Sequence, residues 1–367
     1  MTDRTENRIL TELPSDVETL ANDLVEAAAD CQGSPARMLE WLHRRAKASW
    51  PVVGEHTLQL WELLARTAAV DLVAVRALEP HLDALSIIEQ AAGTGTRRWS
   101  DIDTDTDTWG VFAAEGKGLR LEASATASVS SASSHTEFRL NGIKPWCSLA
   151  STLDYALVSA HVPEGRQLFA VDLRHEGVRV DPIAWVSRGL STVPSGPVSF
   201  TDVPATAVGE VGWYLERPGF AWGGGGVAAC WFGGAYGLYR DIRAAAQQRE
   251  PDQLALASLG RAARAIRDGR ALLREAAERV DRGQFLWADA LALRGSIVAI
   301  CEDLLDIASQ ALGPAALAFD DAHARRVADL AMYVQQHHGA RDDAALGEAI
   351  LSDTNWSPTD PMIGATE

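Results

Sequence analysis

The sequence predicts an α+β multidomain protein with an N-terminal helical domain, a middle antiparallel β domain and a C-terminal four-helix bundle. Apolar residues recur at helical spacing up to about residue 92, alternate with a period of two to about residue 212, and return to helical spacing after Pro218. The polar, low-complexity run DIDTDTDT at 101–108 marks the first boundary. We therefore expect domains at 1–105, 106–212 and 213–367.

Each part shows the period of its predicted elements. In the first part, Leu60, Leu63 and Leu64 recur at helical spacing. In the second part, alternating segments close at Pro or Gly, which predicts short strands at 119–123, 138–140, 155–158 and 168–173. Because such alternation leaves one polar face, we expect a sheet or barrel packed on another layer. In the third part, long Ala/Leu/Arg-rich segments predict bundle helices at 227–248, 253–280, 284–312 and 321–338.

Composition excludes several kinds of partner. The formal net charge is −17 and no Lys/Arg run occurs, so we expect neither nucleic acid nor an anionic membrane as a partner. The N-terminus has no apolar core like that of a signal peptide, and the most apolar stretch, 226–239, is too short to span a bilayer. We therefore expect a cytoplasmic protein. The four cysteines form no ligand spacing, which predicts small buried thiols and no metal site.

The most specific motif lies in the predicted strand region. The segment 140–150, LNGIKPWCSLA, is similar to the motif NGxKxWxTNA in the middle domain of acyl-CoA dehydrogenases. In the same order follow LFAVDL at 168–173, GVRV at 177–180 and VSFTDVP at 198–204, the last being similar to the family's VxFxDVxVP. From Trp109 onward, the chain therefore resembles the acyl-CoA dehydrogenase superfamily of flavoproteins.

The resemblance implies a flavin, FAD or alternatively FMN. In the family the Trp of this motif packs on the isoalloxazine and the Thr hydroxyl hydrogen-bonds flavin N5, roles that correspond here to Trp146 and Ser148. A purely structural interpretation, with Trp146 in the core and Ser148 in a turn, stays open. The family's further flavin contacts correspond to Phe112, Ala113, Arg249, Gln310 and Gly313.

The catalytic position departs from the family. The family's base is a Glu eight residues after the Asp of an RD pair on the last long helix, and the same count from Asp329 gives His337, on the helical face of Tyr333. Imidazole accepts a proton near neutral pH, but a His at this place also resembles the flavin monooxygenase branch, where it manages a peroxyflavin. His81, in RALEPHLDA, resembles a second His of that branch. Alternatively, His81 is structural, and His337 and His338 interact with a helix dipole at the surface.

Other family motifs are missing. After Glu115 the chain reads GKG where the family has GSD. The glycine-rich segment 223–234 contains no acid or base where the family's DxxxR contacts the CoA ester. The adenine-side motif RxxFG is also absent, and Arg249 is the nearby remnant. The resemblance therefore implies a flavin site but not a CoA site.

Three functions are consistent with these features. The first is a flavin-dependent oxidoreductase that acts on a CH–CH bond of a small substrate such as an acyl thioester, with hydride transfer beside Ser148, His337 as base, and an electron-transfer flavoprotein as partner. The second is a flavin monooxygenase of the same fold, supplied by a flavin reductase. The third, which the missing motifs support, is a non-catalytic family member acting as a partner or scaffold. The resemblance also implies a homodimer or homotetramer.

Overall fold

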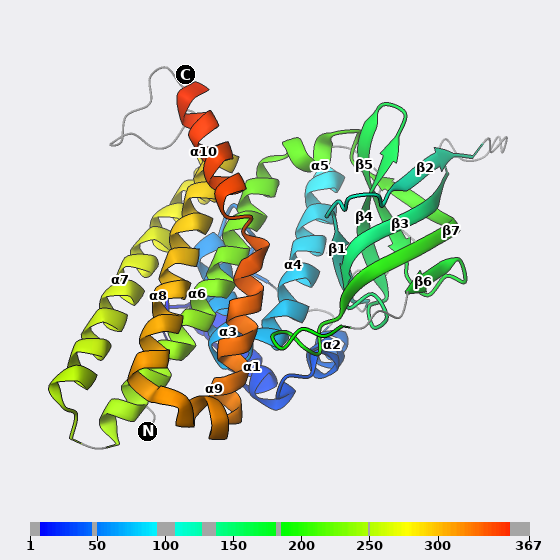
Figure 1. The fold of residues 1–367 in the computed structure, drawn as a ribbon. Coiled ribbons are helices and arrows are strands. Elements are labelled where there is room, and N and C mark those ends of the chain that lie inside the picture. The colour runs from blue at the N-terminus through cyan, green and yellow to red at the C-terminus, as the bar shows by residue number, and fades with distance from the viewer. Residues whose placement is uncertain are drawn as a thin grey trace.

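The computed structural model describes residues 8–45, 50–93, 107–126, 137–180, 185–248 and 250–352. Helices, a strand-rich middle region and further helices follow one another along the chain (Figure 1). The predicted α+β class is therefore confirmed at this level, whereas the boundary after residue 105 lies outside the described residues. Within the described ranges, no helix combines the length and apolar character that crossing a membrane requires.

The first region consists of four helices, α1 to α4, which span Ser15–Cys31, Pro35–Arg44, Thr57–Val70 and Leu72–Gly93. Asp71 separates α3 from α4, and its carboxylate accepts hydrogen bonds from two backbone N–H groups in the first turn of α4. Glu62, fully buried on α3, accepts a hydrogen bond from the backbone N–H of Ile9 at 2.9 Å and from Arg66 Nε at 2.6 Å. These contacts fix the chain before α1 on α3.

The middle region is a sheet of seven strands, β1 to β7, which span Trp109–Phe112, Leu121–Ala125, Phe138–Ser148, Tyr155–Val162, Gly165–Asp172, Val178–Val180 and Ser195–Val208. Strands β2, β3, β7, β5 and β4 pair in this order, and β4 returns to β2 at Glu122 and His161, so these five strands close into a barrel. Strands β1 and β2 run parallel to β4. The purely antiparallel prediction is wrong there, because these strands are joined by crossovers rather than by hairpins.

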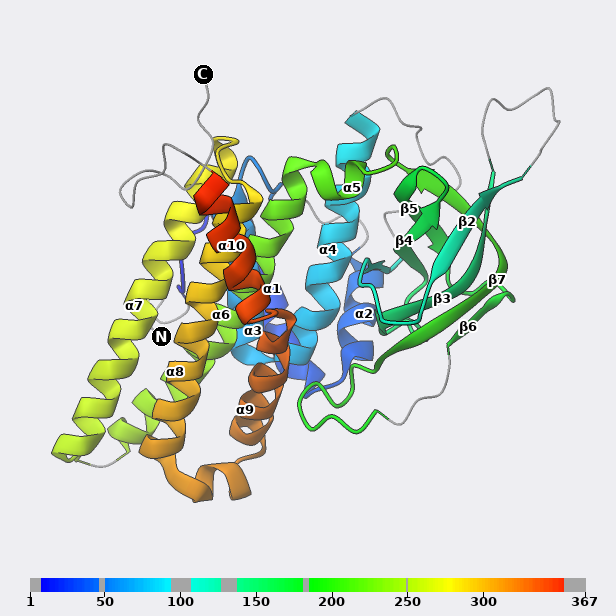
Figure 2. The ribbon, with the colours of Figure 1, turned by 45° about the horizontal axis from the view of Figure 1, so that its top comes forward.

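The sheet packs on α4 through a small apolar cluster of its own. Ile87 and Ile88 of α4 belong to this cluster together with Trp109 of β1, Leu157 of β4 and Leu168 of β5. Helix α4 therefore lies between the sheet and the helices that follow it in the chain (Figures 1 and 2). The expectation that the sheet packs on another layer is confirmed.

The last region contains helices α5 to α10 and the short 3₁₀ helix η1, which span Trp213–Glu216, Pro218–Gln247, Gln253–Asp281, Trp287–Phe319, Asp321–Tyr333, Ala340–Ser352 and, for η1, Val334–Gln336. Helices α6 to α9 occupy the four predicted bundle segments. The prediction is wrong beyond Tyr333, because α9 ends there and His337 has extended backbone. The carbonyl of Gln336 accepts a hydrogen bond from Arg294 Nη2 at 2.9 Å in place of a further helical N–H group.

Helix α6 approaches α3 closely because glycines leave no side chain between them. A Cβ atom on Gly233 would lie 2.4 Å from the carbonyl oxygen of Ala65, and one on Gly225 would lie 2.5 Å from the ring of Trp61. The first of these neighbours is backbone, which cannot rotate away. The glycine-rich segment therefore makes its close contacts within the chain.

We expect Gly233→Ala to lower the free energy of unfolding by about 1–3 kcal/mol, because the added methyl group overpacks the α3–α6 contact. Gly260→Ala is the matched control on α7, where a Cβ atom meets nothing within 4 Å. It should raise the free energy of unfolding by up to about 1 kcal/mol through helix propensity. Urea unfolding measures both variants, and equal stabilities would contradict the close contact.

Candidate functional site

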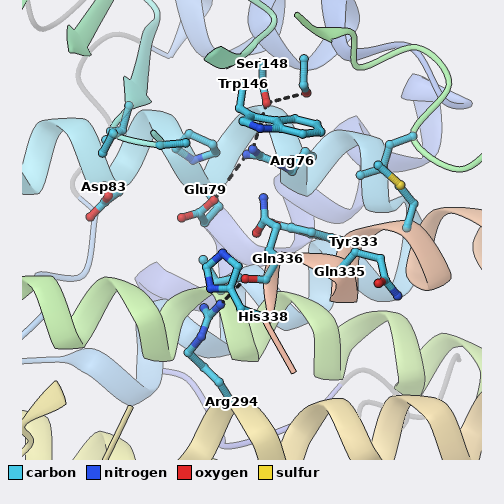
Figure 3. A pocket seen from close by; sticks show the side chains of 18 of the residues that line it. Arg76, Glu79, Asp83, Trp146, Ser148, Arg294, Tyr333, Gln335, Gln336 and His338 are labelled. Carbon is cyan, nitrogen blue, oxygen red and sulfur yellow. Dashed lines mark hydrogen bonds and ion pairs between the residues drawn. The ribbon is translucent and has the colours of Figure 1, made fainter. Parts of the chain in front are cut away.

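A cavity of about 670 Å³ opens where α4, the sheet and the C-terminal helices meet (Figure 3). Its volume is typical of sites for small molecules. Its polar lining residues are Arg76, Glu79, Asp83, Glu115, Ser148, Ser195, Tyr214, Arg294, Tyr333, Gln335, Gln336 and His338. Charged side chains from three separate elements therefore surround one space.

Trp146 reaches the cavity from a bulge in β3. Between the pairs Lys144–Val198 and Cys147–Gly196, β3 contains one residue more than β7. Trp146 lies within this bulge with φ at 58°, a left-handed conformation that residues other than glycine rarely adopt. Its indole is 57% exposed and lines the cavity. The bulge thus presents an aromatic ring to a ligand.

Ser148, at the end of β3, connects the sheet to α4. Its Oγ lies 2.7 Å from Ser195 Oγ and accepts a hydrogen bond from Arg76 Nη2 at 3.1 Å. The guanidinium of Arg76 also lies over the ring of Tyr333, 5.6 Å from its centroid. Arg76 therefore bridges β3 and α9 while it remains part of the cavity wall. Because Arg76 is a donor, the hydroxyl hydrogen of Ser148 is left for Ser195 or for a ligand.

Glu79 supplies a buried carboxyl group to the cavity from α4. Its nearest cation is Arg76, whose Nη1 lies 3.8 Å from Glu79 Oε2. Burial raises the pKa of Glu79 to about 7. The negative charge of Asp83 adds to this rise, and the positive charges of Arg76 and Arg294 oppose it without cancelling it. A carboxyl group with this pKa can accept or donate a proton near neutral pH. Burial also raises the pKa of Asp83, one turn further along α4.

Arg294 enters the cavity from α8. Its guanidinium stacks on the ring of Trp231, 4.6 Å from the centroid. Nη2 donates to the carbonyl of Gln336 at 2.9 Å, and Nη1 donates to the carbonyl of Gly224 at 3.5 Å. Burial lowers the pKa of Arg294, although the negative charge of Asp342 acts to raise it. Neutral groups therefore hold this cation in place.

Glu115 contacts three cationic or basic side chains at the side of the cavity that the sheet forms. Lys144 Nζ, Arg166 Nη2 and His161 Nε2 lie 2.8, 3.1 and 3.4 Å from its carboxylate. Burial alone would raise the pKa of Glu115, but Lys144 and Arg166 outweigh it and hold the pKa below its usual range. Arg166 also donates to the carbonyl of Ala113 at 2.9 Å. Ala113 lines the cavity, and the carbonyl is already occupied.

The structure places His337 outside the cavity lining. Because the backbone leaves the helix after Tyr333, the imidazole turns toward α10, with Nε2 3.7 Å from Asp342 Oδ2. Its Nδ1 accepts a hydrogen bond from the backbone N–H of Gly339 at 3.2 Å. The prediction that His337 shares a helical face with Tyr333 is therefore wrong. His338 lines the cavity instead, and its Nδ1 lies 3.1 Å from Asp342 Oδ1.

His81 lies at the contact between α4 and β1 rather than in the cavity lining. It is 7% exposed, and its Nδ1 accepts a hydrogen bond from the backbone N–H of Trp109 at 3.3 Å. Burial, with a smaller contribution from the nearby His43, lowers the pKa of His81 to about 4. The imidazole is therefore neutral at physiological pH. Phe112, on β1, is also buried and does not line the cavity.

The other predicted flavin contacts lie on α8 or beyond the described residues. Gln310 is exposed and donates to Asp306 Oδ2 at 2.7 Å. Gly313 forms a kink in α8 with φ at 68°. Neither residue lines the cavity, and Arg249 lies outside the described residues. Their part in cofactor binding stays a prediction.

Sequence reasoning missed the charged groups of the cavity wall. On α4, Arg76, Glu79 and Asp83 follow one another at spacings of three and four residues, which places them on one face of an otherwise apolar helix. Arg294 is likewise an isolated charge in the apolar stretch LALRGSIVAI. Since charged side chains are rarely buried in a plain core, this pattern was the available signal for a polar cavity.

Solved structures share this architecture along nearly the whole chain. Butyryl-CoA dehydrogenase from Megasphaera elsdenii is 16% identical with a TM-score of 0.74, over 93% of this chain and 99% of that one. Glutaryl-CoA dehydrogenase from Mycobacterium smegmatis is 15% identical with a TM-score of 0.76, over 95% and 97%. The dibenzothiophene monooxygenase TdsC from Paenibacillus sp. A11-2, bound to FMN, is 16% identical with a TM-score of 0.74, over 94% and 99%. No protein-family model and no curated protein sequence matches the chain.

We expect the neutral His81 to make the fold sensitive to acid. The unfolded chain takes up a proton on this side chain below about pH 6.5, whereas the folded chain does so only near pH 4. Stability therefore falls as the pH drops through this window, by about 2 kcal/mol between pH 7 and pH 5. His81→Asn keeps an acceptor for the N–H of Trp109 and should remove this loss. The measurement is urea unfolding at both pH values, with exposed His338→Asn as control; identical pH dependence in wild type and His81→Asn would refute the assignment.

Proposed function

We propose that this chain, which has the acyl-CoA dehydrogenase fold, is a flavin-dependent oxidoreductase that removes hydrogen from a CH–CH bond of a small substrate in the cavity. One observation carries the proposal: the buried carboxyl group of Glu79 shares a cavity with the exposed indole of Trp146. The indole offers a flat surface to a cofactor ring, and the carboxyl group offers a base to the substrate.

The residues of the cavity fit an isoalloxazine ring. Trp146 presents an exposed aromatic face, and the hydroxyl of Ser148 lies at the same end of β3. The cavity of about 670 Å³ leaves room for a small molecule beside a ring. Structures of the same fold contain FMN in TdsC and FADH2 in glutaryl-CoA dehydrogenase, so we propose FAD or FMN here. A bound flavin supplies the acceptor for two electrons.

Glu79 takes the role of base that the sequence assigned to His337. Its pKa of about 7 leaves a substantial fraction of the carboxylate ionised at neutral pH, and a general base is most effective near this value. Arg76, 3.8 Å away on the same helix, restrains the carboxylate while it hydrogen-bonds Ser148. Arg76 thereby couples the position of the base to the end of β3 that holds the ring.

Oxygenation of a small substrate is a second candidate, favoured by His338 in the cavity lining and by the fold shared with TdsC. Anaerobic reduction of the protein-bound flavin by an added substrate, with a panel of small acids and acyl thioesters, supports dehydrogenation. Oxygen consumption that needs an external flavin reductase supports oxygenation. In the first case an electron-transfer flavoprotein is the proposed partner, and in the second a flavin reductase.

Trp146→Leu should weaken flavin binding about tenfold, because stacking on the indole is lost. The measurement is titration of the purified protein with FAD and with FMN, followed by quenching of flavin fluorescence. Trp287→Leu is the control, since Trp287 is 42% exposed and lies outside the cavity lining. Equal flavin affinity in the two variants would return Trp146 to a structural role.

Glu79→Gln should stabilise the fold at pH 8 and change little at pH 5. The folded pKa of about 7 exceeds the usual value of 4.5, so the buried carboxyl group is neutral at pH 5 and costs stability as the pH rises. A neutral amide avoids this cost, which amounts to about 3 kcal/mol from the shift. Thermal and urea unfolding at both pH values measure the difference.

Glu115→Gln is the matched control for that measurement. The pKa of Glu115 is lowered, and its carboxylate is paired with Lys144 and Arg166. The variant should therefore be less stable than wild type at pH 8, the opposite sign to Glu79→Gln. If both variants lose stability at pH 8, Glu79 is an ordinary paired carboxylate and not the proposed base.

A further inference from the structure

Arg294 is a buried cation that has no anionic partner in the part of the chain that the structure describes. It is 8% exposed, and its Nε makes no hydrogen bond. Among the described residues, no carboxylate oxygen lies within the 4.0 Å of an ion pair with it. Arg66, which is comparably buried on α3, is by contrast paired with Glu62 at 2.6 Å and Glu18 at 2.7 Å.

The charges around Arg294 leave its own charge largely uncompensated. Asp342 and Glu79 lie close enough to act on its pKa but not close enough for an ion pair. Asp342 already accepts hydrogen bonds from the backbone N–H and the side chain of His338. Glu79 loses much of its charge at neutral pH, because its own pKa is about 7. An unpaired guanidinium in such surroundings is unfavourable, so an anion brought by a ligand would stabilise it.

Arg294 is held in a fixed orientation at one end of the cavity. The ring of Trp231 lies against its face, and the carbonyls of Gly224 and Gln336 accept from its two Nη atoms. Figure 3 shows Arg294 on the side opposite Trp146, with Glu79 between them. A molecule that reaches from Arg294 toward Trp146 therefore passes Glu79.

We propose that Arg294 binds a carboxylate of the substrate, so that the substrates are small organic acids; this rests on the proposed function for the reaction itself. The planar guanidinium matches the geometry of a carboxylate, and charge-assisted hydrogen bonds of this type are strong. Held at Arg294, the acid extends its carbon chain past Glu79 toward the ring stacked on Trp146. The glycine-rich segment 223–234 offers no charged side chain to a large carrier such as CoA, which agrees with a small free acid.

The test compares benzoate with benzamide, which has the same shape but no charge, by isothermal titration calorimetry on the purified protein. Benzoate should bind, and Arg294→Gln and Arg294→Met should weaken it at least about 30-fold while they leave benzamide unchanged. Arg294→Lys keeps the charge and should retain part of the preference for benzoate. The melting temperature of Arg294→Gln should be equal to or above that of wild type, because an unpaired buried charge is removed.

Arg282→Gln, which removes an exposed arginine at the end of α7, is the control and should bind benzoate like wild type. The proposal is overturned if wild type does not distinguish benzoate from benzamide. It is also overturned if the Arg294 variants melt lower and lose both compounds equally, since the side chain then only braces Gly224 and Gln336. If Arg294→Gln does not fold, Arg294→Lys decides: an unchanged benzoate affinity would refute the paired geometry.

The same titrations separate this proposal from the proposed function. If no flavin binds and benzoate binding still requires Arg294, the flavin function fails and the carboxylate site stands. If flavin binds and benzoate is not preferred over benzamide, only the proposal of a carboxylate site is refuted.

Discussion

Helix α4 is enclosed on two sides, and this enclosure determines where charge can lie in the molecule. One side packs Ile87 and Ile88 against the sheet, and α3 and α6 contact the helix elsewhere. A helix buried in this way is normally apolar all round. Yet α4 contains Arg76, Glu79 and Asp83, whose burial is tolerable because the three line a shared cavity. The charged side chains of α4 therefore depend on the cavity, which keeps them out of the apolar core.

Charges in such a cavity act on one another more strongly than charges in water. The pKa of Glu79 is held down by Arg76 and Arg294, although burial raises it overall. A carboxylate bound at Arg294 would cancel part of that restraint and raise the proton affinity of Glu79. A bound substrate anion would thus shift Glu79 toward its protonated form at neutral pH, without any movement of the backbone.

Much of the fold could be predicted from the sequence, because the periodicity of apolar residues and the short motifs that indicate helices and strands are local. The alternation at 155–158 and the motif around Trp146 mark strands β4 and β3. The motif also predicted flavin contacts for Trp146 and Ser148, and both residues line the cavity. His337 could not be placed in this way. Helix α9 ends at Tyr333, and the carbonyl of Gln336 after it is bonded to Arg294, a contact between residues far apart in the sequence that no local pattern indicates.

The importance of Glu79 was equally hard to predict, for a different reason. The spacing of Arg76, Glu79 and Asp83 on an apolar helix indicates a polar cavity, but the raised pKa of Glu79 depends on burial by the surrounding elements, which a local pattern does not show. His337 and His81 were predicted from the family resemblance, and imidazole suits the role of a base because it accepts a proton near neutral pH in water. Burial reverses this preference, since it lowers the pKa of His81 to about 4 and raises that of Glu79 to about 7.

The left-handed backbone of Trp146 sets the stability of the fold against the presence of an aromatic ring in the cavity. A side chain in this conformation costs about 1–2 kcal/mol relative to glycine, which adopts it freely. Directed evolution for thermal stability alone would therefore favour glycine at position 146. The resulting protein would be more stable but would lack the indole ring in the cavity. Any library selected for robustness should hold this codon fixed.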